Sequence, residues 1–202
     1  MEQMSKKDLI LKESYKLFLS KGYNAISLTD IERHAKVTRG AIFHHFHSKE
    51  DLFKQVAERF VFSFLEDEGE NNPYLGGAMP LKGFISNRLH IIKRRMEYFY
   101  REVDNCITPA SFMAFILYLK DHYDDWSERI DTYEKHKLQL WEKVICLAKK
   151  RQEIKEDSDI ERLALTFHNL YLGLSYQGAL IDKLSIAQLE ELWDYIYLKH
   201  TT

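Results

Sequence analysis

The chain has few residues that interrupt helices: among its 202 residues, proline occurs three times and glycine eight times. This scarcity leaves little material for strands joined by tight turns. Two cysteines are too few for a disulfide framework and fit a reducing compartment. The chain begins without an apolar run of the signal-peptide type, so we expect a cytoplasmic protein.

Catalytic motifs are missing as well. The sequence has no glycine-rich phosphate loop and no Cys-x-x-Cys, His-Glu-x-x-His or Gly-x-Ser-x-Gly segment. We therefore expect no catalytic residues, no cofactor and no enzymatic activity.

A long run of strongly apolar residues is also absent. Nineteen residues from Leu163 to Ile181 carry no charge, but polar side chains such as His168 and Gln177 interrupt them. A helix that is buried on two sides, once in its own core and once against a second copy of the chain, explains this segment better than a membrane span does. We expect no membrane contact.

Apolar residues instead follow helical spacing along most of the chain. Leu81, Phe84, Ile85 and Ile92, for example, share one face of a helix. Serine, threonine and glycine residues mark the ends of these segments, as helix caps do. We predict an all-α protein of nine helices, over residues 6–21, 27–35, 38–46, 48–65, 81–103, 109–122, 125–150, 159–182 and 185–199.

Charge is divided unevenly along the chain, although the whole chain carries only −2. Residues 1–55 hold ten Lys and Arg against seven Asp and Glu, a net charge of +3, which leaves −5 for the rest. This asymmetry favours a basic binding surface within residues 1–55 and an acidic remainder of the chain.

The three short helices at the N-terminus, with a tight turn between the second and third, have the arrangement of a helix-turn-helix unit. The third would enter the major groove of DNA with its N-terminal residues toward the base edges. Ile42 and Phe46 would face inward and hold this helix. The residues that would face DNA are Lys36, Thr38, Arg39, Gly40, Ala41, Phe43, His44 and His45.

These residue types suit DNA contact in different ways. Thr38 can donate its hydroxyl to a phosphate, and Arg39 can bind either a phosphate or the O6 and N7 atoms of guanine. The two small residues that follow leave room for close approach of the backbone. The phenylalanine and histidines then place flat groups near thymine methyls and phosphates. We interpret the histidines as DNA-facing or solvated and predict no metal site.

Five motifs follow one another between Lys7 and Val56: Leu17-Phe18-Leu19-Ser20-Lys21-Gly22-Tyr23, Ser27-Leu28-Thr29-Asp30-Ile31, Ala35-Lys36-Val37-Thr38, Gly40-Ala41-Ile42-Phe43-His44-His45-Phe46 and Ser48-Lys49-Glu50-Asp51-Leu52. In order and spacing they resemble the DNA-binding segment of the tetracycline-repressor (TetR) family. Lys36 stands where the family has glycine, so we expect a backbone that tolerates a side chain there with some strain. Phe43 stands where tyrosine is usual. The resemblance also assigns phosphate contacts to Thr29 and Lys49, although each could serve its helix start instead.

The resemblance implies a homodimer in which residues 1–50 bind DNA, while residues 51–202 form a helical domain for dimerisation and for a small molecule that lowers DNA affinity. Beyond residue 55 lie 21 of the 27 aromatic residues, which suits a flat or hydrophobic effector, although most of them must be core. Candidate polar groups for such a pocket are His90, Arg94, Tyr98, Tyr133, Trp141, His168 and Tyr171. Candidate dimer contacts on the last two helices are Leu172, Leu174, Gly178, Leu189, Trp193 and Ile196.

The sequence thus predicts a sequence-specific transcriptional regulator, a repressor released from a palindromic operator by a small hydrophobic or aromatic effector. Its expected partners are double-stranded DNA, a second copy of the chain and that effector. The alternative is a helical small-molecule-binding protein without DNA function, for which no salt-sensitive DNA binding is expected. An enzyme and an activator without a ligand are further alternatives.

Overall fold

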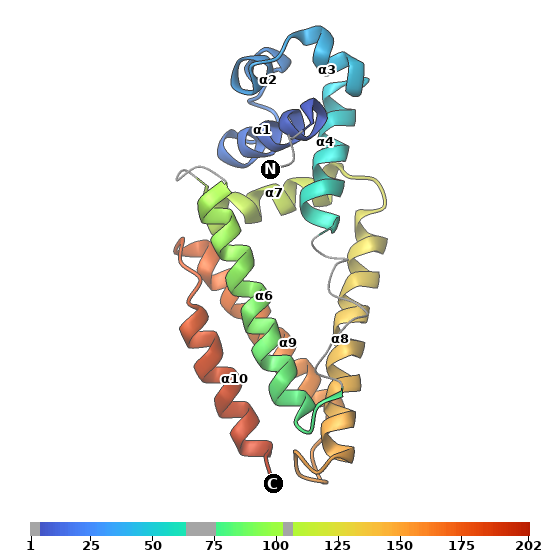
Figure 1. Cartoon of the computed structure of the whole chain (residues 1–202), viewed down its shortest axis with the longest axis vertical. Helices are drawn as coiled ribbons and strands as arrows, with labels where there is room; N and C mark the ends of the chain where they lie inside the picture. Colours follow the sequence, from blue (N-terminus) through green and yellow to red (C-terminus); the bar gives the residue numbers. More distant parts are fainter. Residues whose placement is uncertain (1–4, 64–75, 103–106) are drawn as a thin grey trace. The chain divides into compact units, whose positions relative to one another are not determined.

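Figure 1 shows the computed structural model, which describes residues 5–63, 76–102 and 107–202, with residues 98–102 described by their backbone alone. These residues form nine α-helices and one π-helical turn, and no strand occurs among them. The predicted all-α class is therefore confirmed. In chain order the elements are α1 (Lys6–Lys21), α2 (Leu28–Ala35), α3 (Arg39–His45), α4 (Lys49–Ala57), η1 (Glu58–Phe62), α6 (Pro80–Glu102), α7 (Pro109–His122), α8 (Trp126–Lys150), α9 (Ile160–Leu180) and α10 (Ile186–His200).

Local sequence explains where many of these helices begin. Ser27 and Asp30 form a capping box at the start of α2: Oγ of Ser27 accepts the N–H of Asp30, and the carboxylate of Asp30 accepts the N–H of Ser27 at 2.9 Å. Other N-caps accept the backbone N–H three residues further on, and these are Ser5, Thr38, Ser48, Thr108, Asp159 and Ser185. The short polar residues read as caps in the sequence thus act as caps.

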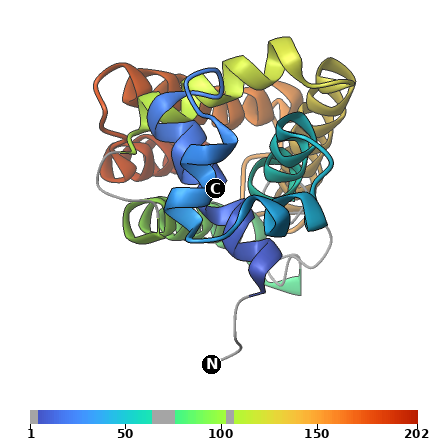
Figure 2. The same cartoon turned by 90° about the horizontal axis from the view of Figure 1, so that it is seen from above.

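The described residues pack as two compact units. The first combines Met1–Glu68 with Val103–Trp126 and contains α1 to α4, η1 and α7 (Figures 1 and 2). Its interior is rich in rings: Phe53 of α4 lies 5.7 Å from both Phe18 of α1 and Phe115 of α7, measured between ring centroids. Tyr15 of α1 also contacts Phe115, at 5.8 Å.

This unit differs from the domain that the sequence suggested for residues 1–50. Residue 50 falls within the first turn of α4, which continues without a break to Ala57. In addition, α7 joins the unit because Phe115 is buried among the rings of α1 and α4. A helix some sixty residues further along the chain therefore completes the core of the N-terminal unit.

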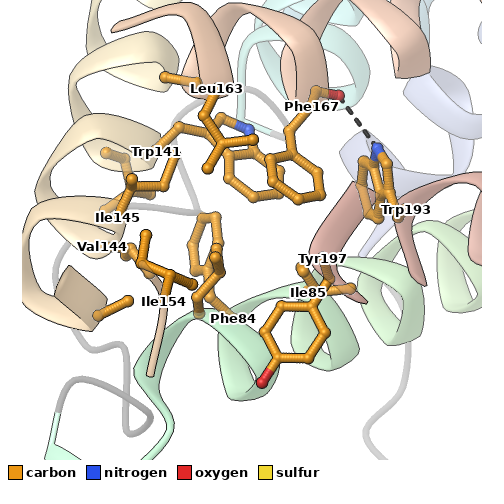
Figure 3. Close-up of a cluster of buried hydrophobic side chains, with 14 of the residues drawn as sticks. Phe84, Ile85, Trp141, Val144, Ile145, Ile154, Leu163, Phe167, Trp193 and Tyr197 are labelled. Carbon is orange, nitrogen blue, oxygen red and sulfur yellow. Dashed lines mark hydrogen bonds between the residues drawn. The ribbon is translucent and has the colours of Figure 1, made fainter. Parts of the chain in front are cut away.

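The second unit combines Gly69–Glu102 with Ser127–Thr202 and contains α6, α9, α10 and nearly all of α8. Trp141 of α8 lies at the centre of its apolar core (Figure 3). Its ring stacks on Phe167 of α9 at 4.8 Å and meets the edges of Phe84 of α6 at 4.7 Å and Trp193 of α10 at 5.5 Å. One aromatic side chain thus joins all four helices.

A buried carboxylate fixes the start of α6. Glu153 is 7% exposed and accepts the backbone N–H groups of Leu81 at 2.9 Å and Lys82 at 2.8 Å. Tyr197 of α10 donates its hydroxyl to the same carboxylate at 3.2 Å. Because the first N–H groups of a helix have no partner within it, Glu153 acts as a cap supplied from 72 residues away. Burial and the nearby carboxylate raise the pKa of Tyr197 to about 12.

Candidate nucleic-acid interface

The turn between α2 and α3 is short and tightly bonded. α2 ends at Lys36, which adopts a left-handed conformation with φ 53° and ψ 43°. The N–H groups of Lys36 and Val37 both turn back to the carbonyl of Glu32. Thr38 then begins α3 as its N-cap. The expected strained position at Lys36 is thus present, because glycine favours this conformation and side chains bearing a Cβ do not.

The two faces of α3 differ as the sequence indicated. Ile42 and the following Phe46 are each 1% exposed and hold the helix against its unit. On the opposite face Arg39, Gly40 and His44 are exposed, while Phe43 keeps 48% of its surface in contact with solvent. The exposed ring of Phe43 offers an apolar contact to a group such as a thymine methyl.

The remaining predicted contacts lie around this face. Lys36 and Thr38 are exposed, and Ala41 and His45 are half-buried. The first turn of α3 contains no acidic residue of its own, which suits an approaching phosphate group. Oγ1 of Thr38 accepts the N–H of Ala41, which leaves its hydroxyl proton for a phosphate oxygen.

Arg39 is engaged by α2. Its Nε lies 2.6 Å from Oε1 of Glu32, and its Nη2 donates to Oγ1 of Thr29 at 3.0 Å. Two predicted DNA contacts, Arg39 and Thr29, are therefore bonded to one another, and an acid that the sequence reasoning did not single out holds the guanidinium. The Arg39 side chain is still 54% exposed, so one face of the guanidinium is accessible.

Lys49 lies differently from the expectation of a phosphate contact. Its ammonium donates to the carbonyl of Tyr23 at 2.7 Å and lies 4.0 Å from the centroid of the Tyr23 ring. Burial lowers the pKa of Lys49. The side chain thus joins the start of α4 to the turn before α2, which supports a structural role for Lys49 at the helix start.

The predicted ligand residues separate into three groups. Tyr133 and Tyr171 are half-buried, and His168 is 8% exposed, with its Nε2 2.6 Å from Oε2 of Glu134. Trp141 belongs to the apolar core, as described above. His90 and Arg94 are exposed on α6, off its inward-facing stripe. Tyr98 lies outside the residues whose side chains the structure describes.

Sequence reasoning missed two buried cations in the second unit. Arg88 of α6 is 5% exposed and Lys137 of α8 is 4% exposed. Burial lowers the pKa of Arg88, against the opposing influence of Tyr171 and Tyr133. The signal was available, since Arg88 follows Leu81, Phe84 and Ile85 on the apolar stripe of its helix.

The predicted dimer contacts differ in how much surface they expose. Leu189 and Trp193 are 0% and 1% exposed, and the indole of Trp193 donates to the carbonyl of Phe167 at 3.1 Å, so both belong to the core of their own chain. Gly178 is buried, and Cα of Leu184 lies 3.0 Å from the position that a Cβ on this residue would take. Leu172 is 40% exposed, and Leu174 and Ile196 are half-buried.

The described residues contain no group of three His, Cys, Asp or Glu side chains arranged to hold a metal ion. Among the same residues, no helix is both long and apolar enough to cross a membrane.

Comparison with known proteins identifies the segment that contains the interface. Residues 10–56 match the family model described as bacterial regulatory proteins, tetR family. The HTH-type transcriptional repressor BepR of Brucella suis biovar 1 is 39% identical over 61 residues, which cover 30% of this chain and 29% of BepR. The HTH-type transcriptional regulator AcrR of Shigella flexneri is 45% identical over 49 residues, 24% of this chain and 23% of AcrR. These matches thus span less than a third of either relative.

The fold of the whole chain is shared with solved structures. SmeT in complex with triclosan superposes with a TM-score of 0.69 over 98% of this chain and 93% of SmeT, at 18% identity. NalD, the secondary repressor of the MexAB-OprM multidrug efflux pump in Pseudomonas aeruginosa, gives a TM-score of 0.64 over 97% of this chain and 96% of NalD, at 19% identity.

A capped α2, a three-residue turn and an α3 that is buried on one face and exposed on the other define a helix-turn-helix unit. The match over residues 10–56 makes the assignment of this segment narrower: its sequence matches the family described as bacterial regulatory proteins, tetR family.

Proposed function

We propose that the protein is a dimeric transcriptional repressor that binds a palindromic DNA site and leaves it when a small molecule binds the second unit. The observation that carries this proposal is the exposed face of α3, on which Arg39, Phe43 and His44 stand opposite the buried Ile42 and Phe46. A buried face fixes the helix, and an open face can read base edges.

The relatives support the regulatory part of the proposal. BepR is named a repressor, as is NalD, and SmeT was solved with the small aromatic molecule triclosan. We infer the same two activities here, binding of DNA and of a small molecule, and no enzymatic turnover. A protein that acts on DNA in this way would work in the cytoplasm.

The proposed dimer uses apolar side chains that α9, its C-terminal end and α10 leave exposed. These are Leu165, Leu172, Tyr176, Leu180, Ile181, Tyr195 and Leu198, each between 40% and 69% exposed. Several large apolar side chains left exposed on two neighbouring helices are what a protein interface would cover. In the dimer, two copies of α3 would enter successive major grooves about 34–36 Å apart.

The test is selection of bound duplexes from a random DNA pool, followed by titration of the enriched duplex at rising salt. We expect a palindromic site, an affinity that falls steeply with salt, and a loss of at least about tenfold in Arg39→Ala, since a good arginine–guanine pair contributes about 1–3 kcal/mol. Arg162→Ala is the matched control, because this arginine of α9 is 87% exposed in the second unit. Absence of enrichment by the folded dimer would overturn the proposal and favour a small-molecule-binding protein without DNA function.

A further inference from the structure

Glu32 of α2 contacts both the turn and α3, through its backbone and its side chain. Its carbonyl accepts the N–H groups of Lys36 and Val37, which form the turn. Its carboxylate accepts the Nε–H of Arg39, the first residue of α3, at 2.6 Å. The preceding Ile31 is 0% exposed and fixes this part of α2 in the core of its unit. The carboxylate that meets the arginine is therefore attached to a well-anchored backbone.

The hydrogen bonds of Arg39 use one edge of its guanidinium. Nε donates to Oε1 of Glu32, and Nη2 donates to Oγ1 of Thr29 at 3.0 Å. Nη1 makes no hydrogen bond with any residue that the structure describes. A guanidinium is planar and carries its N–H groups in a fixed fork, so the remaining donors lie on Nη1 and Nη2. The side chain is 54% exposed, which leaves this second edge open to a ligand.

The ion pair changes which DNA group suits Arg39. A phosphate attracts an arginine mainly through its net charge, and the carboxylate of Glu32 offsets that charge at short range. The O6 and N7 atoms of guanine are uncharged acceptors that require two donors in a fixed geometry. The contacts with Glu32 and Thr29 hold the guanidinium plane and leave such a pair of donors. Guanine therefore fits the held arginine better than a phosphate does.

The neighbouring residues leave phosphate binding to other groups. The hydroxyl of Thr29 accepts from Arg39 and keeps its own proton, which it can donate to a phosphate oxygen. Lys36 is exposed and supplies a cation beside α3. Gly40 is exposed and has no side chain, which leaves room for a base edge next to Arg39. Backbone contact and base contact can thus be made by different residues.

We propose that Glu32 and Thr29 position Arg39 to read one guanine in each half of the DNA site, through its Nη1–Nη2 edge. Glu32 is a positioning residue, because it acts on the base only through Arg39. This inference rests on the proposed function, because it names the base that the helix-turn-helix unit recognises. Glu32 also gains a part in specificity, since it favours a base contact over a phosphate contact.

Replacement of single guanines by 7-deazaguanine tests this inference. The modified base pairs with cytosine but has a carbon in place of N7, so one acceptor of the expected pair is lost. Each duplex carries the replacement at one guanine position of the selected site, in both half-sites. Fluorescence anisotropy should show one position at which it weakens binding at least about fivefold, because a hydrogen bond to a charged group is lost. A selected site without such a guanine would overturn the inference.

Variants show whether Glu32 is responsible for this fivefold effect. Glu32→Gln should reduce it to less than about twofold, because the guanidinium plane is no longer held by a charged partner. Arg39→Ala should abolish it. Glu13→Gln is the matched control and should keep the whole effect, since it breaks an ion pair of the same unit, to Lys16 at 3.0 Å. A full effect in Glu32→Gln would mean that the pair only stabilises the fold, and would overturn the positioning role.

A second variant covers the case in which Glu32→Gln does not fold. Thr29→Val removes the acceptor of Nη2 and keeps a side chain of similar shape, so it should also reduce the effect of 7-deazaguanine. An unchanged effect in the folded Thr29→Val protein would overturn the inference.

The positioning role and the proposed function fail in different ways. A protein that selects a palindromic site but shows no guanine contact that depends on Arg39 would refute guanine recognition and leave the regulator intact. A folded dimer that selects no duplex would refute the regulator, and guanine recognition with it.

Discussion

Replacing Lys36 by glycine separates two effects of one side chain. Lys36 adopts φ 53° and ψ 43°, a left-handed conformation in which a Cβ costs about 1–2 kcal/mol. Glycine removes this strain, but it loses about 0.5–1 kcal/mol more entropy on folding. We therefore expect Lys36→Gly to increase the free energy of unfolding by about 0.5–1 kcal/mol, which raises Tm by about 1–4 °C for a chain of this length.

The same substitution should weaken DNA binding, because it removes a cation beside α3. Each neutralised phosphate contributes about 0.9 to the slope of log affinity against log salt, so the loss of one lysine from each chain of a dimer should reduce that slope by up to about 2. Fluorescence anisotropy on the selected duplex measures this slope, and thermal unfolding followed by circular dichroism measures Tm.

Lys36→Ala is the matched control, since it removes the charge but keeps the Cβ. It should lose the same salt dependence without the gain in Tm. If the glycine variant unfolds at no higher temperature than the alanine variant, the reasoning from backbone strain is refuted. If neither variant changes the salt slope, Lys36 does not contact DNA.

Four further changes test other parts of the structure. Glu32→Gln should release Arg39 for contact with DNA. An exposed ion pair contributes about 0.2–1 kcal/mol, so the loss of two pairs in a dimer should raise non-specific DNA affinity by about 2- to 30-fold. Unchanged binding to a random duplex would contradict this. Glu153→Ala should lower the free energy of unfolding by about 2–4 kcal/mol in urea titrations, because it leaves buried donors without their charged acceptor; a loss below 1 kcal/mol would argue against the cap. Leu172→Glu should favour monomers in sedimentation velocity, whereas Leu117→Glu on α7 should leave the dimer intact. The pKa of Tyr133 is raised to about 12 from an ordinary 10, so the folded chain binds the phenol proton more tightly than the unfolded chain does. The contribution of Tyr133 to the free energy of unfolding should therefore be fully present below pH 10 and be lost as the pH rises toward 12. Tyr133→Phe should reduce this loss when thermal unfolding is measured at alkaline pH.

Much of the N-terminal unit could be predicted because its signals are local. Ser27 and Asp30 lie three residues apart, so the capping box is visible in the sequence and present in the structure. The inward direction of Ile42 and Phe46 follows from helical spacing in the same way. The strained turn at Lys36 could be predicted from the family pattern.

The parts that could not be predicted depend on residues far apart in the chain. Arg39 was assigned to DNA, and nothing in the local pattern indicates that Glu32, seven residues earlier, would lie 2.6 Å from it. Trp193 was placed in a dimer interface because apolar periodicity cannot distinguish a core stripe from an exposed one. Glu153 has no signal at all, since the two backbone N–H groups that it caps lie more than seventy residues away.

Phe115 has a consequence for engineering. An exchange of the DNA-binding segment between relatives would take its junction at the end of the matched residues 10–56. Here a junction at residue 57 would separate Phe53 and Tyr15 from the ring on α7 that completes their core. A hybrid that also carries residues 109–122 keeps these contacts, so we expect its N-terminal unit to fold. The shorter exchange should give an insoluble protein or a loosely packed N-terminal unit.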